Sequence, residues 1–201
     1  MVSWILGAAS FVRFPEPLPL QTVHPAFSKQ QIPFGLLSEN GSLKLGAFTL
    51  NFSAGSTVEY TATANQQVSI LNVPAYQKLV LSGMGIKSVQ SGGNLIVQSS
   101  CDIQPGSTLA LTGNASENLY LNNDASLEVK AGATFDNGGE SSITASAGTP
   151  SILISGTFRT KDAQGFTGSG AAIPSIVPVL SNGCTIEYSR FGDQAIQATL
   201  T

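Results

Sequence analysis

Residues 55–68 read GSTVEYTATANQQV, and residues 183–196 read GCTIEYSRFGDQAI. Both stretches carry glycine, threonine, a β-branched residue, Glu-Tyr, glutamine and a final β-branched residue in one register without a gap, and they start 128 positions apart. A period of that length is too long for one coil of a solenoid, so it indicates a block of several coils or a whole domain. We therefore expect the chain to be part of a larger repetitive protein, with a second copy of the unit beginning near residue 183.

The composition of the chain is polar without being charged. Charged residues make up 10% of the 201 residues, the net charge is −3, and hydrophobic residues make up 42%. These values exclude a highly charged disordered chain and provide no basic surface for nucleic acid. The 25 Ser, 16 Thr and 21 Gly residues favour strands joined by tight turns over helices.

From residue 41 onward the chain consists of short runs in which apolar and polar residues alternate. The runs are three to five residues long and lie at 43–45, 48–52, 57–60, 78–81, 94–97, 108–111, 118–121, 126–129, 152–154 and 157–160. A period of two is the signature of strands, and no longer window has the apolar spacing of a helix. The sequence therefore predicts an all-β fold.

Two architectures fit such strands, a sandwich and a solenoid. Asn-Gly pairs at 40–41, 137–138 and 182–183 suit the hairpins of a sandwich, but the strands around them are very short. A phrase made of a turn residue, Ser or Thr and two spaced apolar residues recurs at Gly55, Gly106, Ala125, Gly132 and Gly183. The spacing from Leu109 to Leu127 matches the length of a coil. We therefore predict a parallel β-solenoid, in which like side chains stack on successive coils.

A family resemblance supports this prediction. Residues 76–89, YQKLVLSGMGIKSV, resemble the phrase Y-x-x-L-x-L-S-G-x-G-x-K of long secreted repeat proteins from Bacteroidetes-type bacteria. In those proteins the phrase follows S-T-V-E-Y and Q-x-V, as it does here at 56–60 and 66–68, and residues 156–170 resemble the run that leads into the next copy. The resemblance covers residues 55–201. It implies a single-stranded right-handed parallel β-helix in a secreted or cell-surface, adhesin-like protein.

Three segments are expected along the chain. Residues 1–40 form a Pro-rich, irregular leader or cap, residues 41–182 the solenoid block, and residues 183–201 the start of the second copy. The apolar stretch at 2–12 has no Lys or Arg before its apolar run, so we interpret it as a strand that covers the first open edge, with a signal peptide as the alternative. No run reaches the ~20 apolar residues of a membrane span.

Candidate catalytic acids stand singly in the sequence. The pairs to consider are Asp124 with Glu128 and Asp136 with Glu140, and the possible basic partners are Arg159 and Arg190. A glycosidase needs two carboxyl groups across a cleft, and a lyase needs acids beside a basic residue. Because Glu128 alternates with apolar neighbours, we expect these acids to lie on a solvated outer face rather than in a site.

The recurring Glu-Tyr pairs permit a structural prediction. Alternation places Tyr60 and Tyr188 inside the solenoid and Glu59 and Glu187 outside. The recurrence of the Glu-Tyr pair is then explained by repeated structure. A functional site at the two glutamates is the weaker alternative.

No other ligand site is expected. His24, the single histidine, has no recognisable nucleophile near it, and the glycine-rich residues 165–170 lack the lysine of a phosphate loop and indicate a flexible loop outside the solenoid. Calcium binding at Asp136 would be expected within a G-G-x-G-x-D nonapeptide repeat, which the sequence lacks. Cys101 and Cys184 are expected to be free thiols, and zinc is not expected because the sequence has one histidine and no Cys-x-x-Cys pair.

Surface recognition also has few candidates. Ice binding needs Thr-x-Thr on successive coils, and the pattern occurs once, at Thr61 and Thr63. Sugar stacking needs exposed aromatic rings, for which Trp4, Phe166 and Phe191 are the candidates.

The sequence thus predicts a non-catalytic structural or adhesive module without cofactor, metal or catalytic residues. The alternative is a polysaccharide-active β-helix enzyme of the lyase or glycoside hydrolase type, which a cluster of acids and an arginine on adjacent coils, facing one groove, would indicate. Expected partners are extracellular polysaccharide or other surface proteins, and a second copy of the chain at the C-terminal end, where a cut solenoid exposes strand edges.

Overall fold

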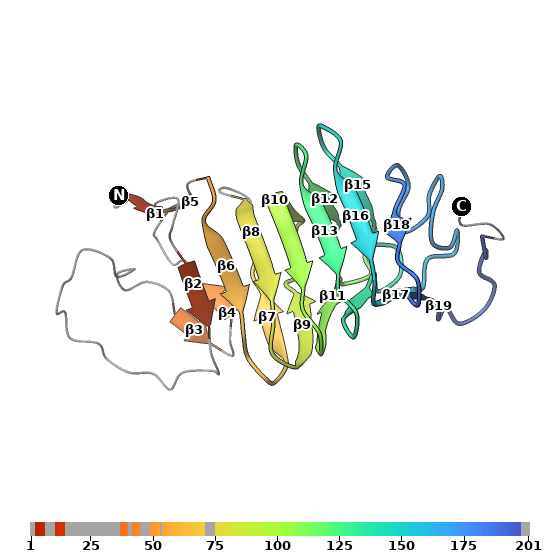
Figure 1. Ribbon diagram of the computed structural model, residues 1–201, viewed down its shortest axis with the longest axis horizontal. Helices are drawn as coiled ribbons and strands as arrows, with labels where there is room; N and C mark the ends of the chain where they lie inside the picture. Colours follow the sequence, from red (N-terminus) through yellow and green to blue (C-terminus); the bar gives the residue numbers. More distant parts are fainter. Residues whose placement is uncertain are drawn as a thin grey trace.

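The computed structural model of the chain is an elongated β-solenoid of about five turns. It describes residues 54–70 and 75–197 in full. It also describes the backbone of five further strands, β1 (Ser3–Leu6), β2 (Phe11–Phe14), β3 (Leu37–Glu39), β4 (Ser42–Lys44) and β5 (Thr49–Phe52). The strands succeed one another along the long axis, with β6 toward one end of the rod and β19 toward the other (Figure 1). The predicted all-β solenoid is confirmed.

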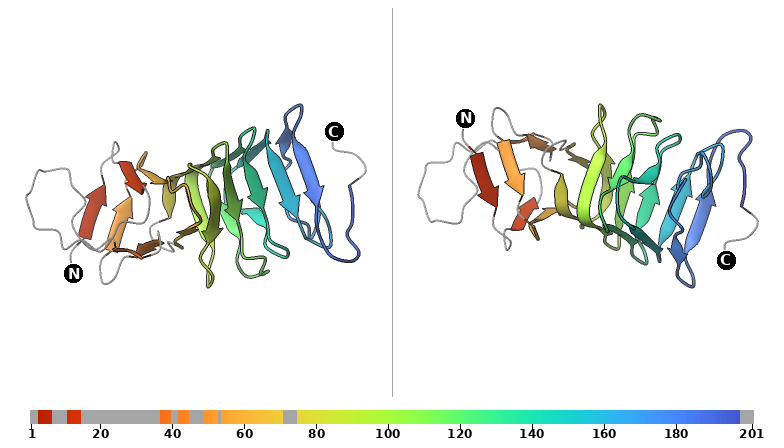
Figure 2. Two further views of the ribbon diagram at one scale, coloured as in Figure 1. Left: turned by 90° about the horizontal axis from the view of Figure 1, so that it is seen from below. Right: turned by 90° about the horizontal axis from the view of Figure 1, so that it is seen from above.

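The solenoid has two long sheets and a shorter third face. The first sheet contains β6 (Thr57–Tyr60), β8 (Tyr76–Leu81), β10 (Leu95–Ile103), β13 (Ser126–Val129), β16 (Ser151–Ile154) and β18 (Val179–Leu180). The second contains β7 (Gln66–Val68), β9 (Gly85–Val89), β11 (Ser107–Ala110), β14 (Thr134–Asp136), β17 (Thr157–Thr160) and β19 (Thr185–Tyr188). The third face consists of the first half of β10 with β12 (Leu119–Leu121) and β15 (Ile143–Ala145). Figure 2 shows these strands from below and above, stacked along the rod.

Every strand pairing from β6 to β19 is parallel, whereas β3 and β4 pair antiparallel, and the coil length varies along the rod. Thr57 pairs with Lys78 in the next coil near the start of the rod, and Thr157 pairs with Thr185 near its end, so the later coil is the longer one. The prediction that Leu109 and Leu127 are separated by one coil is wrong. Leu109 pairs with Phe135 in the second sheet, and Leu127 belongs to the first sheet. The number of residues per coil depends on the length of the turns, which the alternation of apolar and polar residues does not reveal.

Apolar side chains fill the interior in columns that run from coil to coil. Alternation along each strand directs every second residue inward, and the parallel register places these residues above one another. One column contains Val58, Leu79, Cys101, Leu127 and Ile152, none more than 2% exposed. In the second sheet the rings of Phe135 and Phe158 are stacked with centroids 5.0 Å apart. The core is therefore continuous through the described coils.

The two similar stretches have the same local structure but lie on different sheets. Gly55 and Gly183 both adopt positive φ, 81° and 86°, in the turn before a strand. In the first stretch the side chain of Gln66 accepts a hydrogen bond from the backbone N–H of Ala62, and in the second Gln194 accepts one from Arg190. Yet the first stretch forms β6 in the first sheet and the second forms β19 in the second sheet. The recurrence therefore encodes a turn, a strand and a glutamine-closed corner, which can be used on either face.

The solenoid continues past the predicted boundary at residue 183. β19 pairs with β17 over four residues, so residues 183–188 form part of the same stack. At the other end β2 lies beside β6 at the edge of the first sheet, and β1 pairs with β5. Strands thus occur in the apolar N-terminal stretch, as expected. Most of the Pro-rich leader, including His24, lies outside the described residues. Among the described residues no helix has the length and apolarity of a membrane span.

The burial of the two Glu-Tyr pairs agrees only in part with the prediction. Tyr60 is fully buried, as predicted, and its hydroxyl lies 2.9 Å from that of Tyr76. Tyr188 is only half-buried against the core, because no described coil follows β19. Glu59 takes the outward position, in register with Val80 and Asp102, as predicted, but its expected exposure is wrong. It is only 8% exposed, and Ser82 of the next coil donates a hydrogen bond to its carboxylate at 2.7 Å. Glu187 lies on the outer face, as predicted.

Candidate functional site

The outer face of the second sheet carries two regular columns of side chains, which are polar except for Ala110. One column consists of Thr108, Thr134, Thr157 and Thr185 on four successive coils. Two residues further along each strand, a second column contains Ala110, Asp136, Arg159 and Glu187. The columns arise because β11, β14, β17 and β19 all have a threonine at one outward position, and the parallel register aligns these positions.

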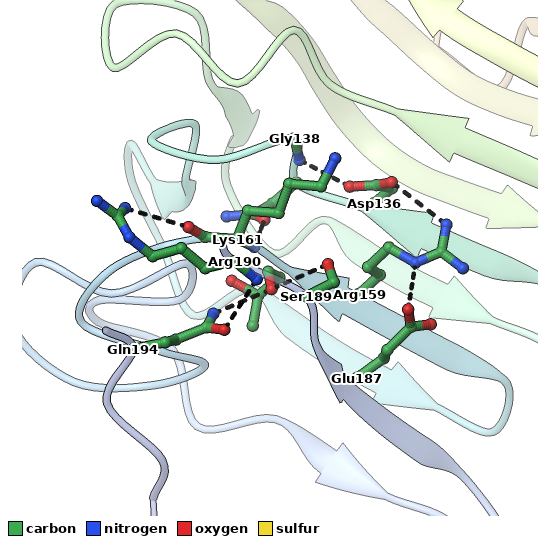
Figure 3. Close-up of polar contacts among 10 residues, drawn as sticks. Asp136, Gly138, Arg159, Lys161, Glu187, Ser189, Arg190 and Gln194 are labelled. Carbon is green, nitrogen blue, oxygen red and sulfur yellow. Dashed lines mark hydrogen bonds and ion pairs between the residues drawn. The ribbon is translucent and has the colours of Figure 1, made fainter. Parts of the chain in front are cut away.

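Asp136, Arg159 and Glu187 form a ladder of ion pairs across three coils, which we call the ion ladder. The Nε atom of Arg159 lies 2.9 Å from Oε1 of Glu187, and Nη1 lies 3.5 Å from Oδ2 of Asp136. The side chains are 37%, 40% and 15% exposed, in the order Arg159, Glu187 and Asp136. Figure 3 shows the guanidinium group between the two carboxylates. The ion ladder thus supplies acids and an arginine on adjacent coils, but the enzyme alternative also requires that these side chains face one groove.

The opposite charges in the ion ladder attract one another, as in an ion pair that stabilises a fold. The hydrogen bond with Glu187 raises the pKa of Arg159, and the charges of Glu187 and Asp136 add to this effect, while burial opposes it. Asp136 also accepts a hydrogen bond from the backbone N–H of Gly138 at 2.9 Å. Both carboxylates therefore face a cation or an amide. A glycosidase pair instead needs an open gap for a sugar and water between its carboxyl groups.

The second candidate base, Arg190, lies near the ion ladder but is not part of it. Its Nη1 atom donates to the backbone oxygen of Lys161 at 3.4 Å, and its backbone N–H donates to Gln194 (Figure 3). Gln194 in turn donates to the backbone oxygens of Thr160 and Asp162 in the preceding coil, each at 3.0 Å. These contacts close the corner after β19, so Arg190 and Gln194 join coils rather than line a site.

The structure does not bring together the acid pairs proposed from the sequence. Asp124 lies in the turn before β13 and accepts hydrogen bonds from the N–H and hydroxyl of Thr149 at 3.0 and 3.1 Å. The backbone hydrogen bond is the main cause that lowers the pKa of Asp124. Glu128 lies on the outer face beside Lys130, 4.0 Å away. Glu140 is exposed in a turn, apart from the strand position of Asp136.

The acids that do lie side by side were not predicted. Asp102 of β10 and Glu128 of β13 are direct neighbours on the outer face of the first sheet. Burial raises the pKa of Asp102, and the charge of Glu128 raises it further. The sequence contains a signal for this pairing of acids, because residues 100–103 and 126–129 both read Ser, apolar, acid, apolar. The register that aligns these stretches is, however, a property of the turns between them.

The surface candidates have different outcomes. Phe166 is fully buried, with its ring edge-on to Phe158 at 4.9 Å, so neither a sugar-binding role nor the prediction of a loop outside the solenoid holds for it. Phe191, in contrast, is 103% exposed in the turn after β19. Thr61 and Thr63 lie in the turn after β6 and form no array on a sheet. The side chain of Trp4 lies outside the described residues.

The thiols and possible metal ligands are readily placed. Cys101 and Cys184 are free, as predicted, and burial raises the pKa of the Cys101 thiol. Within residues 54–70 and 75–197, no group of three His, Cys, Asp or Glu side chains is arranged to hold a metal ion.

Comparison with known proteins identifies no relative. No family model matches the chain, and no match occurs among curated proteins or solved structures. The class of the protein is therefore defined by its fold, a parallel β-solenoid with regular outer columns.

Proposed function

We propose that the chain is a non-catalytic structural or adhesive module of a large exported bacterial surface protein. The observation that carries this proposal is the unbroken stacking of coils from β6 to β19, with like side chains above one another inside and outside. Backbone hydrogen bonds in such a stack run parallel to the rod axis. A rod of this kind suits a part that spaces other domains or presents a surface.

Hydrogen bonds at the corners support a structural role. The backbone N–H of Asn118 donates to the side chain of Asn94 at 2.8 Å, and the N–H of Ser142 donates to the side chain of Asn118 at 2.7 Å. At another corner the buried Asn137 accepts a hydrogen bond from the N–H of Lys161 at 3.1 Å. These side chains bind successive coils together without relying on ion pairs. They account for a rod in which only 10% of residues are charged.

The proposed surface location rests on the resemblance of residues 55–201 to secreted repeat proteins. Protease treatment of intact source cells, followed by mass spectrometry of the released peptides, tests it. We expect peptides that contain residues 76–87 to be released from intact cells. Release only after lysis would argue against export.

The ion ladder supports a second candidate function, a polysaccharide-active enzyme. It supplies two carboxylates and an arginine on three successive coils. We rank this function below the module because Arg159 occupies the position between the carboxylates that a substrate would need.

Incubation of the chain with acidic and neutral polysaccharides separates the two functions. An adhesive module is expected to be retarded by a polysaccharide in affinity electrophoresis without forming reducing ends or unsaturated products. Phe191 is the exposed ring for such binding, so Phe191→Ala should reduce the retardation. Product formation that is lost in Asp136→Asn and Glu187→Gln but kept in the surface control Asp193→Asn would establish the enzyme instead.

A second copy of the chain is the proposed partner at the C-terminal end. β18 and β19 are the last strands of both sheets within the described residues, so one edge of each strand is unpaired there. Leu180 and Ile186 are only partly buried, whereas their neighbours in the preceding coil, Ile154 and Phe158, are fully buried. Unpaired edges above apolar side chains promote pairing with another chain.

The C-terminal ends of two copies of the chain can contact each other in a two-fold arrangement. Its exposed apolar residues are Val177, Val179, Phe191 and Ile196. The turn after β19 carries one cation, Arg190, and one anion, Asp193, both exposed, so two copies approach without net repulsion. A closed two-fold contact uses the same surface on both copies, and such contacts are the commonest in homo-oligomers.

A further inference from the structure

We propose that Asn182 and Gly183 form a site of spontaneous deamidation that modifies the last described coil. The inference does not depend on the proposed function. In this reaction the backbone nitrogen of Gly183 attacks the side-chain carbonyl carbon of Asn182. A C–N bond forms, ammonia leaves, and the resulting succinimide is opened by water to aspartate or isoaspartate. Water is the only co-reactant.

The turn that holds these residues is open to the reaction. Cys184 N–H donates to the backbone oxygen of Ser181 at 3.1 Å, which places Asn182 and Gly183 at the two central positions of a turn between β18 and β19. Both residues are exposed. Gly183 has φ of +86°, and no atom lies within 4 Å of the point where a Cβ would stand. Without a side chain at Gly183, the nucleophilic nitrogen is accessible and the backbone can change conformation.

The reacting groups are also unrestrained. Within the described part of the chain, neither the Asn182 side chain nor the Gly183 N–H takes part in a hydrogen bond. No bond must therefore break before the nitrogen can approach the side-chain carbonyl carbon.

The same dipeptide at Asn137 and Gly138 provides an internal comparison. Asn137 is fully buried, and its side-chain nitrogen donates to the backbone oxygens of Gly139 and Ser141 at 2.9 and 3.0 Å. The Gly138 N–H, the nucleophile in this case, donates to Asp136 at 2.9 Å. A Cβ at Gly138 would lie 2.6 Å from the backbone oxygen of Leu111, so the chain is closely packed there. Deamidation at Asn137 therefore requires local opening of the coil.

The modification changes the chemistry of the rod end. Aspartate adds a negative charge to a turn whose neighbour Ser181 shares a hydrogen bond with Ser155, 2.8 Å away. Isoaspartate also inserts a carbon atom into the backbone of the turn that sets the register of β19. The last coil is thus expected to loosen as the protein ages.

Peptide mapping by mass spectrometry tests the site. The folded chain is incubated at physiological temperature and mildly alkaline pH. The mass increase from replacing the side-chain NH2 by OH is followed in the peptides that contain Asn182 and Asn137. We expect Asn182 to convert at least about tenfold faster than Asn137, because each ~1.4 kcal/mol of local opening slows a reaction tenfold. In guanidinium chloride the two sites should convert at similar rates. Asn182→Gln should abolish the fast event.

Two outcomes would overturn the proposal. One is equal conversion of Asn182 and Asn137 in the folded chain. The other is an Asn182 that stays intact when folded but converts in guanidinium chloride, which would mean that the turn protects it.

Discussion

Lys87 extends from an interior position of β9 to the backbone oxygen of Ala62, with Nζ and oxygen 2.5 Å apart. Lys87 is fully buried and lies in the same column as the apolar Leu109. Its ammonium group also donates to the backbone oxygen of Met84 at 3.1 Å. The lysine thus serves the carbonyl groups of two corners, where an apolar residue would leave them without this donor.

Replacing this buried donor should therefore destabilise the first coils. We expect Lys87→Met to lower the free energy of unfolding by about 1–3 kcal/mol, the cost of leaving buried carbonyl groups unsatisfied. The exposed Lys78→Met is the control, with a change within about 0.5 kcal/mol. Chemical denaturation measures both. Equal effects would show that the Lys87 contacts contribute nothing.

The two tyrosines of the similar stretches should differ in their contribution to stability. Tyr60 is fully buried and Tyr188 half-buried. Tyr60→Ala should cost about 3–5 kcal/mol, the range for deleting a large buried ring. Tyr188→Ala should cost clearly less, because part of its surface already contacts water. Thermal unfolding of the two variants decides the matter, and an equal loss would mean that the end of the rod is as well covered as the middle.

Asp102 should reduce stability at neutral pH. Its pKa in the folded chain is raised from an ordinary value of 3.8, by burial and then by Glu128. A carboxyl group with a raised folded pKa binds its proton more tightly in the folded state, so stability falls as pH rises from the ordinary value through the raised one. Asp102→Asn should therefore stabilise the chain at pH 7 by roughly 0.2–1 kcal/mol, the size of a cross-strand pair.

The pH dependence provides the check on this prediction. The advantage of Asp102→Asn over the unmodified chain should shrink as the pH falls below the ordinary value of 3.8, where the carboxyl group is protonated in both states. Asp193→Asn, at an exposed acid, is the matched control and should show little change. A destabilised Asp102→Asn at pH 7 would mean that attraction to Lys78 and Lys130 outweighs burial and the repulsion from Glu128.

The C-terminal end should mediate reversible dimerisation. Sedimentation analysis across a range of concentrations should show the mass rising toward two chains. Val179→Lys combined with Phe191→Ser should weaken the dimer, because a lysine on an edge strand opposes pairing. Ile86→Lys is the control, since Ile86 is 41% exposed on β9, which is paired on both edges and far from β19. A chain that stays monomeric, a dimer indifferent to the double variant, or open-ended polymers would each contradict the two-fold arrangement.

Local sequence patterns were sufficient for the fold class and for many of the strands, although the alternating runs did not include β7, β9, β15 or β18. Alternation with a period of two is a property of neighbouring residues, so it correctly placed Tyr60 inside and Glu187 outside. The recurrence of residues 55–68 at 183–196 correctly indicated repeated local structure, including the glutamine that closes each corner. These features depend on a few adjacent residues and need no knowledge of the neighbouring coil.

The tertiary structure alone decided which coil positions meet. The coils differ in the length of their turns, and the turns determine that Asp136, Arg159 and Glu187 align and that Asp102 faces Glu128. For the same reason Glu59 is covered, Phe166 reaches the core, and the two similar stretches lie on different sheets. The sequence by itself determined the fold class and the inward faces of the strands it predicted, because backbone sterics and side-chain alternation act locally. The register between coils depends on turn lengths and on packing across a whole coil, so only the folded chain determines the outer columns.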